Sequence, residues 1–548
     1  MSAPRATATA ARSAAVEREL SDTSRVLAAL PRRISDIPAL HVARAPAAPA
    51  LREGRRVWTY GELSAAIERC ATDLAAAGVG GGDRVLIVGE NCVALVAVLL
   101  GAARLDAWAV PVNPRLSARE IDAIREHCAP RRVVYLAQAS PDAPAHAARH
   151  GATETWGADG MGRVLLGRRN DECRPEPVSE DPSVQVAAVL YTSGTTGDPK
   201  GVMLTHRNLL YIARLSSALR MLVPGDRIYG ALPISHVYGL ASVCLGTLFA
   251  GACVHLEPWY TPLELLHALA QDRITILQGV PAMYAMLLDY IRRSGAPIDA
   301  PALRYCYAGG SPLSPALKAD VERAFGAPLH NGYGLTEASP TIAHTRLDAP
   351  RDDCSVGMLL PGLEMRIVDL ADPGHSDARE GEAGELWVRG PNVMRGYYRD
   401  PALTARTIDP EGWLNTGDIA RRDPDGALFI VGRTKELIIR SGFNVYPVEV
   451  ESVLNAHPAV LQSAVVGRPV DGNEAVVAFV ELSPGATATQ EHIGRFAAER
   501  LAPYKRPAEI VILPALPKTS TGKILKQRLR AMATRSSDVP NEERNHVA

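Results

Sequence analysis

The chain has 548 residues, 47% hydrophobic and 22% charged, with a formal net charge of −1 at pH 7. This length exceeds a single domain, and the composition is typical of a globular protein rather than a fibrous or disordered one. The near-zero net charge gives no reason to expect nucleic acid or an anionic membrane surface as a partner. The cysteines form no CxxC pair, which argues against a zinc site or a disulfide framework and favours a cytoplasmic location.

The N-terminal segment is rich in Ala, Arg and Ser and lacks the apolar core of a secretory signal. Its acidic residues Glu17, Glu19 and Asp22 are atypical of an organelle transit peptide. We therefore expect a disordered tail over residues 1–25. The polar residues 533–548 predict a second disordered tail at the other end.

From residue 58 to about residue 350 the pattern alternates between helix and strand. Residues 61–78 are amphipathic and end at a glycine, as a helix does, and the apolar run 84–89 follows as a buried strand. Similar apolar runs recur with helical patterns between them, at residues 131–136, 227–232, 252–256, 274–280 and 303–309. This order predicts α/β layers, with ligands at the carboxyl ends of the strands.

Residues 228–256 contain no Asp, Glu, Lys or Arg and are numerous enough to span a bilayer. Glycines and a proline interrupt the stretch, which indicates strand, loop, helix and strand inside a buried core. No transmembrane span is expected. Farther along, residues 357–430 combine short strands with Gly/Pro turns and predict a β-rich part, and a separate small α/β unit follows.

The segment YTSGTTGDPKG, residues 191–201, combines glycines, hydroxyl residues and a lysine. Glycines let several backbone N–H groups converge on one anion, and the hydroxyls and the ammonium add donors. A strand-like run precedes the segment and a helical pattern begins at His206, so we expect a phosphate loop between strand and helix. It is not a Walker A loop, because Asp198 and Pro199 follow Gly197. The expected polyphosphate ligands are Thr192, Ser193, Gly194, Thr195, Thr196, Gly197 and Lys200.

This segment resembles the phosphate-binding signature of the adenylate-forming superfamily, which includes acyl-CoA synthetases, luciferases and peptide-synthetase adenylation domains. Further segments match that superfamily in the same order: residues 231–240, 307–315, 331–340, 413–418 with 432–451, and 516–530. The resemblance implies an acyl-CoA synthetase/luciferase-like α/β fold. Its large AMP-binding domain, residues 26–434, would contain two α/β layers and a β-rich subdomain, and a small mobile α/β domain would span residues 435–532.

The resemblance also implies a nucleotide site. Thr336 would offer its hydroxyl to the α-phosphate, and Glu337 would offer a hard oxygen to Mg²⁺, with Thr196 as a further ligand. A carboxylate beside a triphosphate is unfavourable unless a cation lies between them, so Glu337 implies the metal. The expected contacts to adenine, ribose and phosphate are Gly309, Gly310, Asn331, Gly332, Tyr333, Asp418 and Arg433.

In the small domain, Lys523 matches the family lysine that enters the site for adenylation. Its ammonium would bridge the substrate carboxylate and the α-phosphate. Lys435 matches the hinge between the domains, and Gly442 and Asn444 lie in the loop that binds the thiol substrate. Both half-reactions use one pocket, so the small domain is expected to rotate about Lys435 between them.

His236 is expected to close the wall between the nucleotide and the acyl group. The residues expected around the acyl group are uncharged: Tyr238, Gln278, Gly309, Gly332 and Thr341. This argues against a dicarboxylate, whose second charge would need a buried partner. The segment 231–240 also lacks an acid that could hold a substrate ammonium, so a fatty or an aryl acid is expected, and this choice stays open.

These expectations describe an ATP- and Mg²⁺-dependent acyl-CoA synthetase. It would convert a carboxylic acid to acyl-AMP with release of pyrophosphate, and then transfer the acyl group to coenzyme A. One alternative is a ligase that loads a carrier-protein thiol. Another is a catalytically silent nucleotide-binding scaffold, against which Lys200, Glu337, Asp418 and Lys523 weigh.

Overall fold

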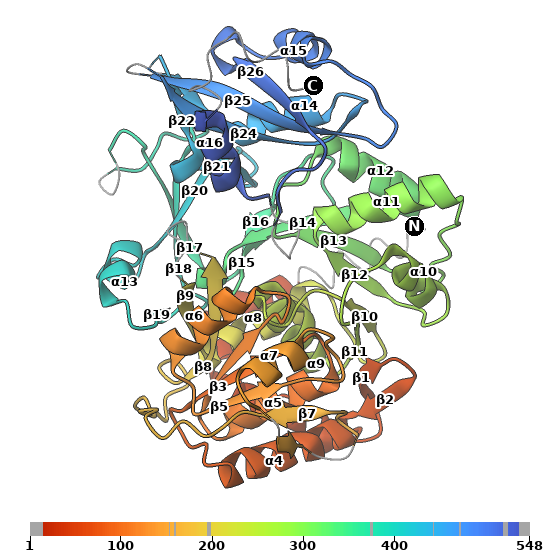
Figure 1. The fold of residues 1–548 in the computed structure, drawn as a ribbon, viewed down its shortest axis with the longest axis vertical. Coiled ribbons are helices and arrows are strands. Elements are labelled where there is room, and N and C mark those ends of the chain that lie inside the picture. The colour runs from red at the N-terminus through yellow and green to blue at the C-terminus, as the bar shows by residue number, and fades with distance from the viewer. Residues whose placement is uncertain are drawn as a thin grey trace. The chain divides into compact units, whose positions relative to one another are not determined.

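The computed structural model describes residues 15–152, 154–157, 160–193, 199–372, 376–441, 443–470, 473–518 and 524–535. Its elements, drawn in Figure 1, form an α/β structure of two compact units. The large unit consists of Met1–Leu313, Ala319–Met365 and Trp387–Thr416. The small unit consists of Ser314–Lys318, Arg366–Leu386 and Gly417–Ala548. The expected α/β fold with a large and a smaller part is confirmed.

One sheet of the large unit has eight strands in the order β19-β9-β8-β4-β3-β5-β7-β6. Its parallel centre consists of β3 (Arg84–Val88), β4 (Trp108–Val112) and β5 (Arg132–Tyr135). These strands are almost wholly buried, as expected for parallel strands covered on both faces. The other strands are β6 (Glu154–Trp156), β7 (Val164–Leu166), β8 (Val186–Ser193), β9 (Pro199–Thr205) and β19 (Gly396–Tyr397).

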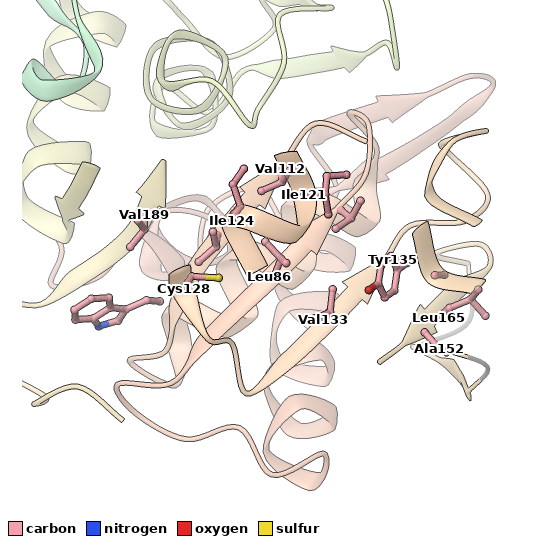
Figure 2. Close-up of a cluster of buried hydrophobic side chains, with 14 of the residues drawn as sticks. Leu86, Val112, Ile121, Ile124, Cys128, Val133, Tyr135, Ala152, Leu165 and Val189 are labelled. Carbon is pink, nitrogen blue, oxygen red and sulfur yellow. The ribbon is translucent and has the colours of Figure 1, made fainter. Parts of the chain in front are cut away.

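A core of branched and aromatic side chains packs against one face of this sheet (Figure 2). Leu86, Val112 and Val133 come from the central strands, and Ile121 and Ile124 come from α6 (Ala118–Cys128). The helix begins at a capping box, in which the side chains of the N-cap serine and the glutamate three residues later bond each other's backbone N–H. Local capping and burial of the apolar face thus select the same helix.

The second sheet has nine strands in the order β16-β15-β14-β13-β12-β10-β11-β1-β2. The strands are β1 (Pro49–Glu53), β2 (Arg56–Thr59), β10 (Arg227–Gly230), β11 (Cys253–Leu256), β12 (Ile276–Gly279), β13 (Tyr305–Gly309), β14 (Leu329–Gly334), β15 (Thr341–His344) and β16 (Met358–Leu359). Strands β10, β12, β13 and β14 run parallel, and β15 pairs antiparallel with β14. The carboxyl ends of the parallel strands β10, β12, β13 and β14 therefore meet at one edge of the sheet. The candidate acyl-lining residues lie at this edge.

Helices fill the space between these two sheets. α5 (Val93–Arg104) is buried along nearly its whole length and contacts β1 of one sheet and β3 and β4 of the other. α8 (His206–Leu219) contacts β9 and the π-helix η2 (Tyr238–Leu245), which in turn contacts β10. A helix that is apolar on all sides is expected where it has no solvent face.

The remaining helical segments include the following elements: α2 (Thr23–Ala28), η1 (Ile34–Asp36), α3 (Ala39–Val42), α4 (Tyr60–Ala76), α7 (Ala143–Arg149), α9 (Gly246–Phe249), α10 (Pro262–Ala270), α11 (Pro281–Ser294), α12 (Pro315–Phe325), η3 (Thr336–Ala338) and α13 (Pro401–Thr407). The charge-free stretch 228–256 is divided into β10, a loop, η2 with α9, and β11, as the turn-forming residues predict. Within the described ranges, no helix combines the length and the apolar character needed to cross a membrane.

The β-rich segment forms a sheet of four strands in the order β17-β18-β20-β21. These are β17 (Glu364–Val368), β18 (Gly384–Arg389), β20 (Leu414–Arg422) and β21 (Leu428–Arg433). In the small unit, a three-stranded sheet, β24 (Val460–Val470), β25 (Asn473–Leu482) and β26 (Glu509–Leu513), packs against α14 (Pro447–Asn455), α15 (Gln490–Ala498) and α16 (Lys526–Arg535). The short elements η4 (Thr434–Glu436), β22 (Ile438–Arg440), β23 (Phe443–Val445) and η5 (Pro503–Lys505) complete the small unit.

The expected disordered tail over 1–25 is wrong for the part that the structure describes, residues 15–25. Residues 15–21 are helical and Leu20 is fully buried. Glu17 accepts a hydrogen bond of 2.7 Å from Arg346, and Glu19 pairs with Arg214. The acidic residues that argued against a transit peptide therefore attach this segment to the large unit. Residues 1–14, and 536–548 of the second expected tail, lie outside the described residues, whereas 533–535 close α16.

The expected domain boundary at residues 434 and 435 stays a prediction. Contacts within the chain group residues 366–386 and 417–434 with the small unit, although the sequence pattern assigned them to the β-rich part of the large domain. Residues that pack together do not by themselves locate a hinge, because a hinge is a pair of flexible backbone torsions. The hinge role of Lys435 therefore needs a functional test.

A buried ion pair gives a stability prediction for the large unit. Asp83 and Arg131 are almost fully buried and lie 3.2 Å apart, and Arg131 also donates to the carbonyl oxygens of Asn170 and Cys173. Asp83→Ala leaves this guanidinium without its counter-charge, which costs about 3–5 kcal/mol of unfolding free energy. Urea unfolding followed by circular dichroism measures the loss.

The matched control is Asp320→Ala, which removes an exposed pair with Arg323 on α12. This change should alter the unfolding free energy by about 0.5 kcal/mol or less, because water screens the pair. Equal effects of the two substitutions would contradict the assignment of a stabilising role to burial of the Asp83 pair.

Candidate active site

The described ends of the predicted phosphate loop lie on two antiparallel strands, β8 and β9. Thr192 of β8 pairs with Lys200 of β9, and Ser193 pairs with Pro199. The segment lies between the strand β8 and the helix α8, which begins at His206 as expected, and the structure adds a further strand, β9, that runs antiparallel to β8 before that helix. The apolar residues after Lys200 prefer strand pairing in a buried sheet to helix. The predicted ligands Gly194, Thr195, Thr196 and Gly197 lie outside the described residues.

The β8–β9 strand pair and the segment around Glu337 meet at Tyr397. The Nζ atom of Lys200 lies 6.0 Å from the centroid of the Tyr397 ring, over its face. The Tyr397 hydroxyl donates a hydrogen bond of 2.8 Å to Oε1 of Glu337. Burial and then the Glu337 carboxylate raise the pKa of Tyr397, so the hydroxyl keeps its proton at neutral pH. Tyr397 thus connects two motifs that are more than a hundred residues apart in the sequence. The sequence analysis did not predict this tyrosine.

The backbone around Glu337 is held rigidly in the large unit. Glu337 lies in the short 3₁₀ helix η3, and its carbonyl accepts a hydrogen bond of 2.9 Å from the N–H of Met394. The buried Asn392 amide donates to the carbonyl of Ala338 at 3.0 Å, and the Ser339 hydroxyl donates back to Asn392 at 2.8 Å. Thr336 is buried beside Glu337. These bonds hold the backbone at Glu337 and so orient its side chain.

The expected acyl-lining residues lie together at the carboxyl edge of the nine-stranded sheet. Gly309 and Gly332 are register partners on β13 and β14. An added Cβ on Gly309 would lie 3.4 Å from the Tyr238 ring. Gln278, on β12, is fully buried and is the register partner of Tyr307. Thr341, on β15, approaches Ser242 of η2 at 3.4 Å between hydroxyl oxygens.

Three expected nucleotide contacts occupy this same edge. Gly310 has φ of 80°, a left-handed conformation that favours glycine, so the turn after β13 depends on that residue. The Asn331 amide donates to the carbonyls of Cys354 and Ser355, at 3.3 and 3.1 Å, and so anchors a neighbouring loop. Tyr333 is half-buried on β14. The structure thus gives Asn331 a structural function, and its nucleotide contact stays a prediction.

His236 lies in the loop before η2, and its side chain is exposed. Its Nδ1 accepts a hydrogen bond of 3.3 Å from the N–H of Tyr238, and its own N–H donates to Pro233 at 2.9 Å. The π-helix that begins at Tyr238 is a rare element, and such turns are frequent at functional sites. The wall-closing role of His236 stays a prediction.

The other expected site residues belong to the small unit. Asp418 and Arg433 are register partners on β20 and β21, and the Arg433 Nε lies 2.8 Å from Oδ1 of the buried Asp418 carboxylate. Lys435 lies in η4, and Asn444 pairs with Ile439 in the β22–β23 hairpin. Gly442 and Lys523 lie outside the described residues. An ion pair orients the carboxylate of Asp418, which fits a group that would accept hydrogen bonds from ribose hydroxyls.

Glu337 is chemically suited to Mg²⁺. It supplies a carboxylate oxygen, the ligand type that Mg²⁺ prefers. Tyr397 orients that carboxylate by donating a hydrogen bond to its Oε1 atom. Lys200 adds a second positive charge nearby for phosphate oxygens. The chemistry of the described donors therefore fits a metal-bound triphosphate, for which Glu337 would be the protein ligand.

Comparison with known proteins agrees with this geometry. Residues 39–398 match the AMP-binding enzyme family and residues 449–523 match the AMP-binding enzyme C-terminal domain. The chain is 36% identical to the indoleacetate–CoA ligase of Aromatoleum aromaticum, covering 91% of this chain and 97% of that protein. It is also 36% identical to a feruloyl-CoA synthase of Amycolatopsis sp., with 90% and 97% covered. The crystal structure of ATP-bound MatB from Rhodopseudomonas palustris superposes with a TM-score of 0.79 at 31% identity, covering 91% of this chain and 98% of that one.

The fold and the site therefore define an adenylate-forming enzyme. The chain belongs to the AMP-binding enzyme family, among its acid–CoA ligases, which use ATP and release AMP.

Close packing at Gly332 gives a second stability prediction. An added Cβ there would lie 2.0 Å from the Tyr307 hydroxyl and 3.1 Å from the carbonyl of Ala343. Gly332→Ala should destabilise the large unit by about 1–3 kcal/mol, because Tyr307 is buried and must shift. Gly309→Ala is the matched control, since its nearest contacts are at an ordinary 3.4 Å. Thermal unfolding compares them, and equal shifts in Tm would contradict the packing argument.

Proposed function

We propose that this ligase activates an aryl carboxylic acid, in the site that contains Lys200, Glu337 and the acyl-lining residues of the nine-stranded sheet. The observation that carries the site assignment is Tyr397, whose ring lies 6.0 Å from the ammonium of Lys200 and whose hydroxyl donates to the carboxylate of Glu337. One tyrosine thereby brings together the phosphate-loop motif and the expected Mg²⁺ ligand.

The first half-reaction converts a poor acyl donor into a good one. A carboxylate oxygen attacks the α-phosphorus of ATP, the new P–O bond forms, and the bond to the departing pyrophosphate breaks. Lys200 binds phosphate oxygens and Thr336 donates to the α-phosphate. Lys523, which lies outside the described residues, would bridge the carboxylate and the α-phosphate and stabilise the charge that develops there. Mg²⁺ held by Glu337 would neutralise phosphate charge when bound.

The second half-reaction forms the thioester. The coenzyme A sulfur attacks the carbonyl carbon of acyl-AMP, the C–O bond to AMP breaks, and the thiol proton is released. We infer that Asn444 and Gly442 contact the thiol substrate, and that the small domain rotates about Lys435 to bring them to the acyl-AMP. Asp418 and Arg433 bind the ribose through both half-reactions.

Two observations support an aryl acid. A Cβ added to Gly309 would lie 3.4 Å from the Tyr238 ring, so an aromatic side chain borders the expected acyl-lining residues and an aryl substrate could pack beside it. The relatives reported above are a ligase of indoleacetate and a synthase of feruloyl-CoA. A fatty acid is the remaining alternative from the sequence.

The deciding experiment measures pyrophosphate release and CoA thioester formation with matched acids. The panel contains 3-phenylpropenoate, indole-3-acetate, octanoate and hexadecanoate, each with ATP, Mg²⁺ and coenzyme A. We expect the aryl acids to give the higher kcat/KM by at least about tenfold. Higher values for the fatty acids would refute the aryl assignment, and absence of turnover with every acid would refute the site assignment.

A further inference from the structure

A layer of polar side chains is buried on one face of the nine-stranded sheet. Register places Gln278 of β12 beside Tyr307 of β13, Tyr307 beside His330 of β14, and Gly332 beside His344 of β15. Residues two apart on a strand share a face, so Tyr305 and Gly332 lie on this face as well. All of the polar members are buried. Such a face is normally apolar, and this one is not.

Arg220 is buried against this polar layer. It is the C-cap residue of α8 and is only 3% exposed. The central carbon of its guanidinium lies 4.5 Å from the centroid of the Tyr307 ring, over its face. The Tyr305 hydroxyl donates to the Arg220 carbonyl at 2.8 Å, which fixes the backbone. Its Nη1 makes no hydrogen bond among the described residues.

Among the described residues, no Asp or Glu forms an ion pair with Arg220. Burial raises the pKa of Tyr238, Tyr305 and Tyr307, so these hydroxyls are uncharged at neutral pH. Burial and then Arg220 lower the pKa of His344 to about 3, so that imidazole is neutral as well. A buried cation surrounded by neutral groups is unfavourable unless something else supplies the counter-charge or an acceptor.

Among the described residues, further buried polar atoms in the same layer make no hydrogen bond: the hydroxyl oxygen of Tyr238 and both amide atoms of Gln278. The Tyr307 hydroxyl interacts with the Arg220 side chain itself. Tyr238 and Gln278 belong to the expected acyl-lining residues. The Tyr307 hydroxyl lies 2.0 Å from the position that a Cβ added to Gly332 would take. The unsatisfied atoms therefore belong to or adjoin the expected acyl-lining residues.

We propose that Arg220 determines substrate specificity by receiving an oxygen acceptor at the end of the substrate remote from the reacting carboxylate. This inference rests on the proposed function, because it concerns the acid that the same site activates. Arginine only donates, so its partner must accept hydrogen bonds. The Tyr238 and Tyr307 hydroxyls and the Gln278 amide are further donors in this layer. A ring hydroxyl and a second carboxylate share this chemistry, and the experiment distinguishes them.

The test uses three acids of one shape: 3-phenylpropenoate and its 4-hydroxy and 4-carboxy derivatives. For each enzyme, kcat and KM of pyrophosphate release are measured, and the ratio of kcat/KM for an oxygen-bearing acid to that for the plain acid is calculated. In the unaltered enzyme this ratio should exceed about 10 for at least one derivative. The derivative with the larger ratio identifies the acceptor as hydroxyl or carboxylate.

Arg220→Met, which keeps an unbranched apolar side chain, should lower that ratio about 10- to 100-fold, mainly through KM. Arg220→Lys keeps the charge without the planar fork and should give an intermediate ratio. Arg214→Met on the same helix, whose partner is the remote Glu19, is the control and should leave the ratio unchanged.

A ratio near 1 in the unaltered enzyme, or the same ratio in Arg220→Met, would overturn the inference while the proposed function stands. If Arg220→Met does not fold, the test compares the kcat/KM ratio of the unaltered enzyme with that of Arg220→Lys. The same ratio in both enzymes overturns the inference. Turnover of none of the acids in the panel above would instead refute the proposed function, and this inference with it.

Discussion

Replacing Lys523 with alanine should slow the formation of acyl-AMP on the order of a hundredfold or more, and should spare thioester formation from supplied acyl-AMP. The reason is that the ammonium acts on charge that exists only while the carboxylate attacks the α-phosphate. Once AMP is attached, the thiol reaction no longer needs that cation. Single-turnover pyrophosphate release measures the first step, and CoA thioester formation from synthetic acyl-AMP measures the second.

The matched control is Arg528→Ala, which removes another cation from the same end of the chain. Arg528 is exposed on α16, and its loss should leave both steps unchanged. If Lys523→Ala slowed both half-reactions equally, the assigned role would be wrong, because a residue specific to adenylation cannot affect the later step.

Replacing Glu337 with glutamine should lower pyrophosphate formation about a hundredfold or more and raise the Mg²⁺ concentration needed for half-maximal rate. The amide keeps the shape of the side chain and an oxygen that can accept from Tyr397, so only the charge is lost. A neutral oxygen is a weaker ligand for a hard divalent cation. A Mg²⁺ titration of pyrophosphate release at saturating ATP shows both effects.

Tyr397→Phe separates orientation from charge at the same carboxylate. It removes the hydroxyl that donates to Glu337 at 2.8 Å and keeps the ring beside Lys200. We expect a loss of about tenfold, typical of a group that orients a metal ligand. A Mg²⁺ dependence of Glu337→Gln identical to that of the unaltered enzyme would show that Glu337 does not hold the metal.

Local patterns predicted the elements of the fold better than their connections. The periodicity of apolar residues located β3, β10, β12 and β13. It also placed the start of α8 at His206, but it did not predict that residues 199–205 pair with β8 as the strand β9. Composition predicts disorder for residues 15–25. In the structure Leu20 is buried, because this segment packs with parts of the chain that are distant in sequence.

The amino-acid sequence by itself determined the family, the order of the motifs and the chemistry of the residues that carry them, since these are properties of consecutive residues. Only the tertiary structure decided which distant side chains meet. Tyr397 belongs to no predicted motif, yet strand pairing between β9 and β19 places it between Lys200 and Glu337. Arg220 ends an ordinary amphipathic helix, and its lack of a counter-charge depends on what the sheet beneath it presents. Long-range proximity and desolvation are properties of the packed chain, so no window of sequence contains them.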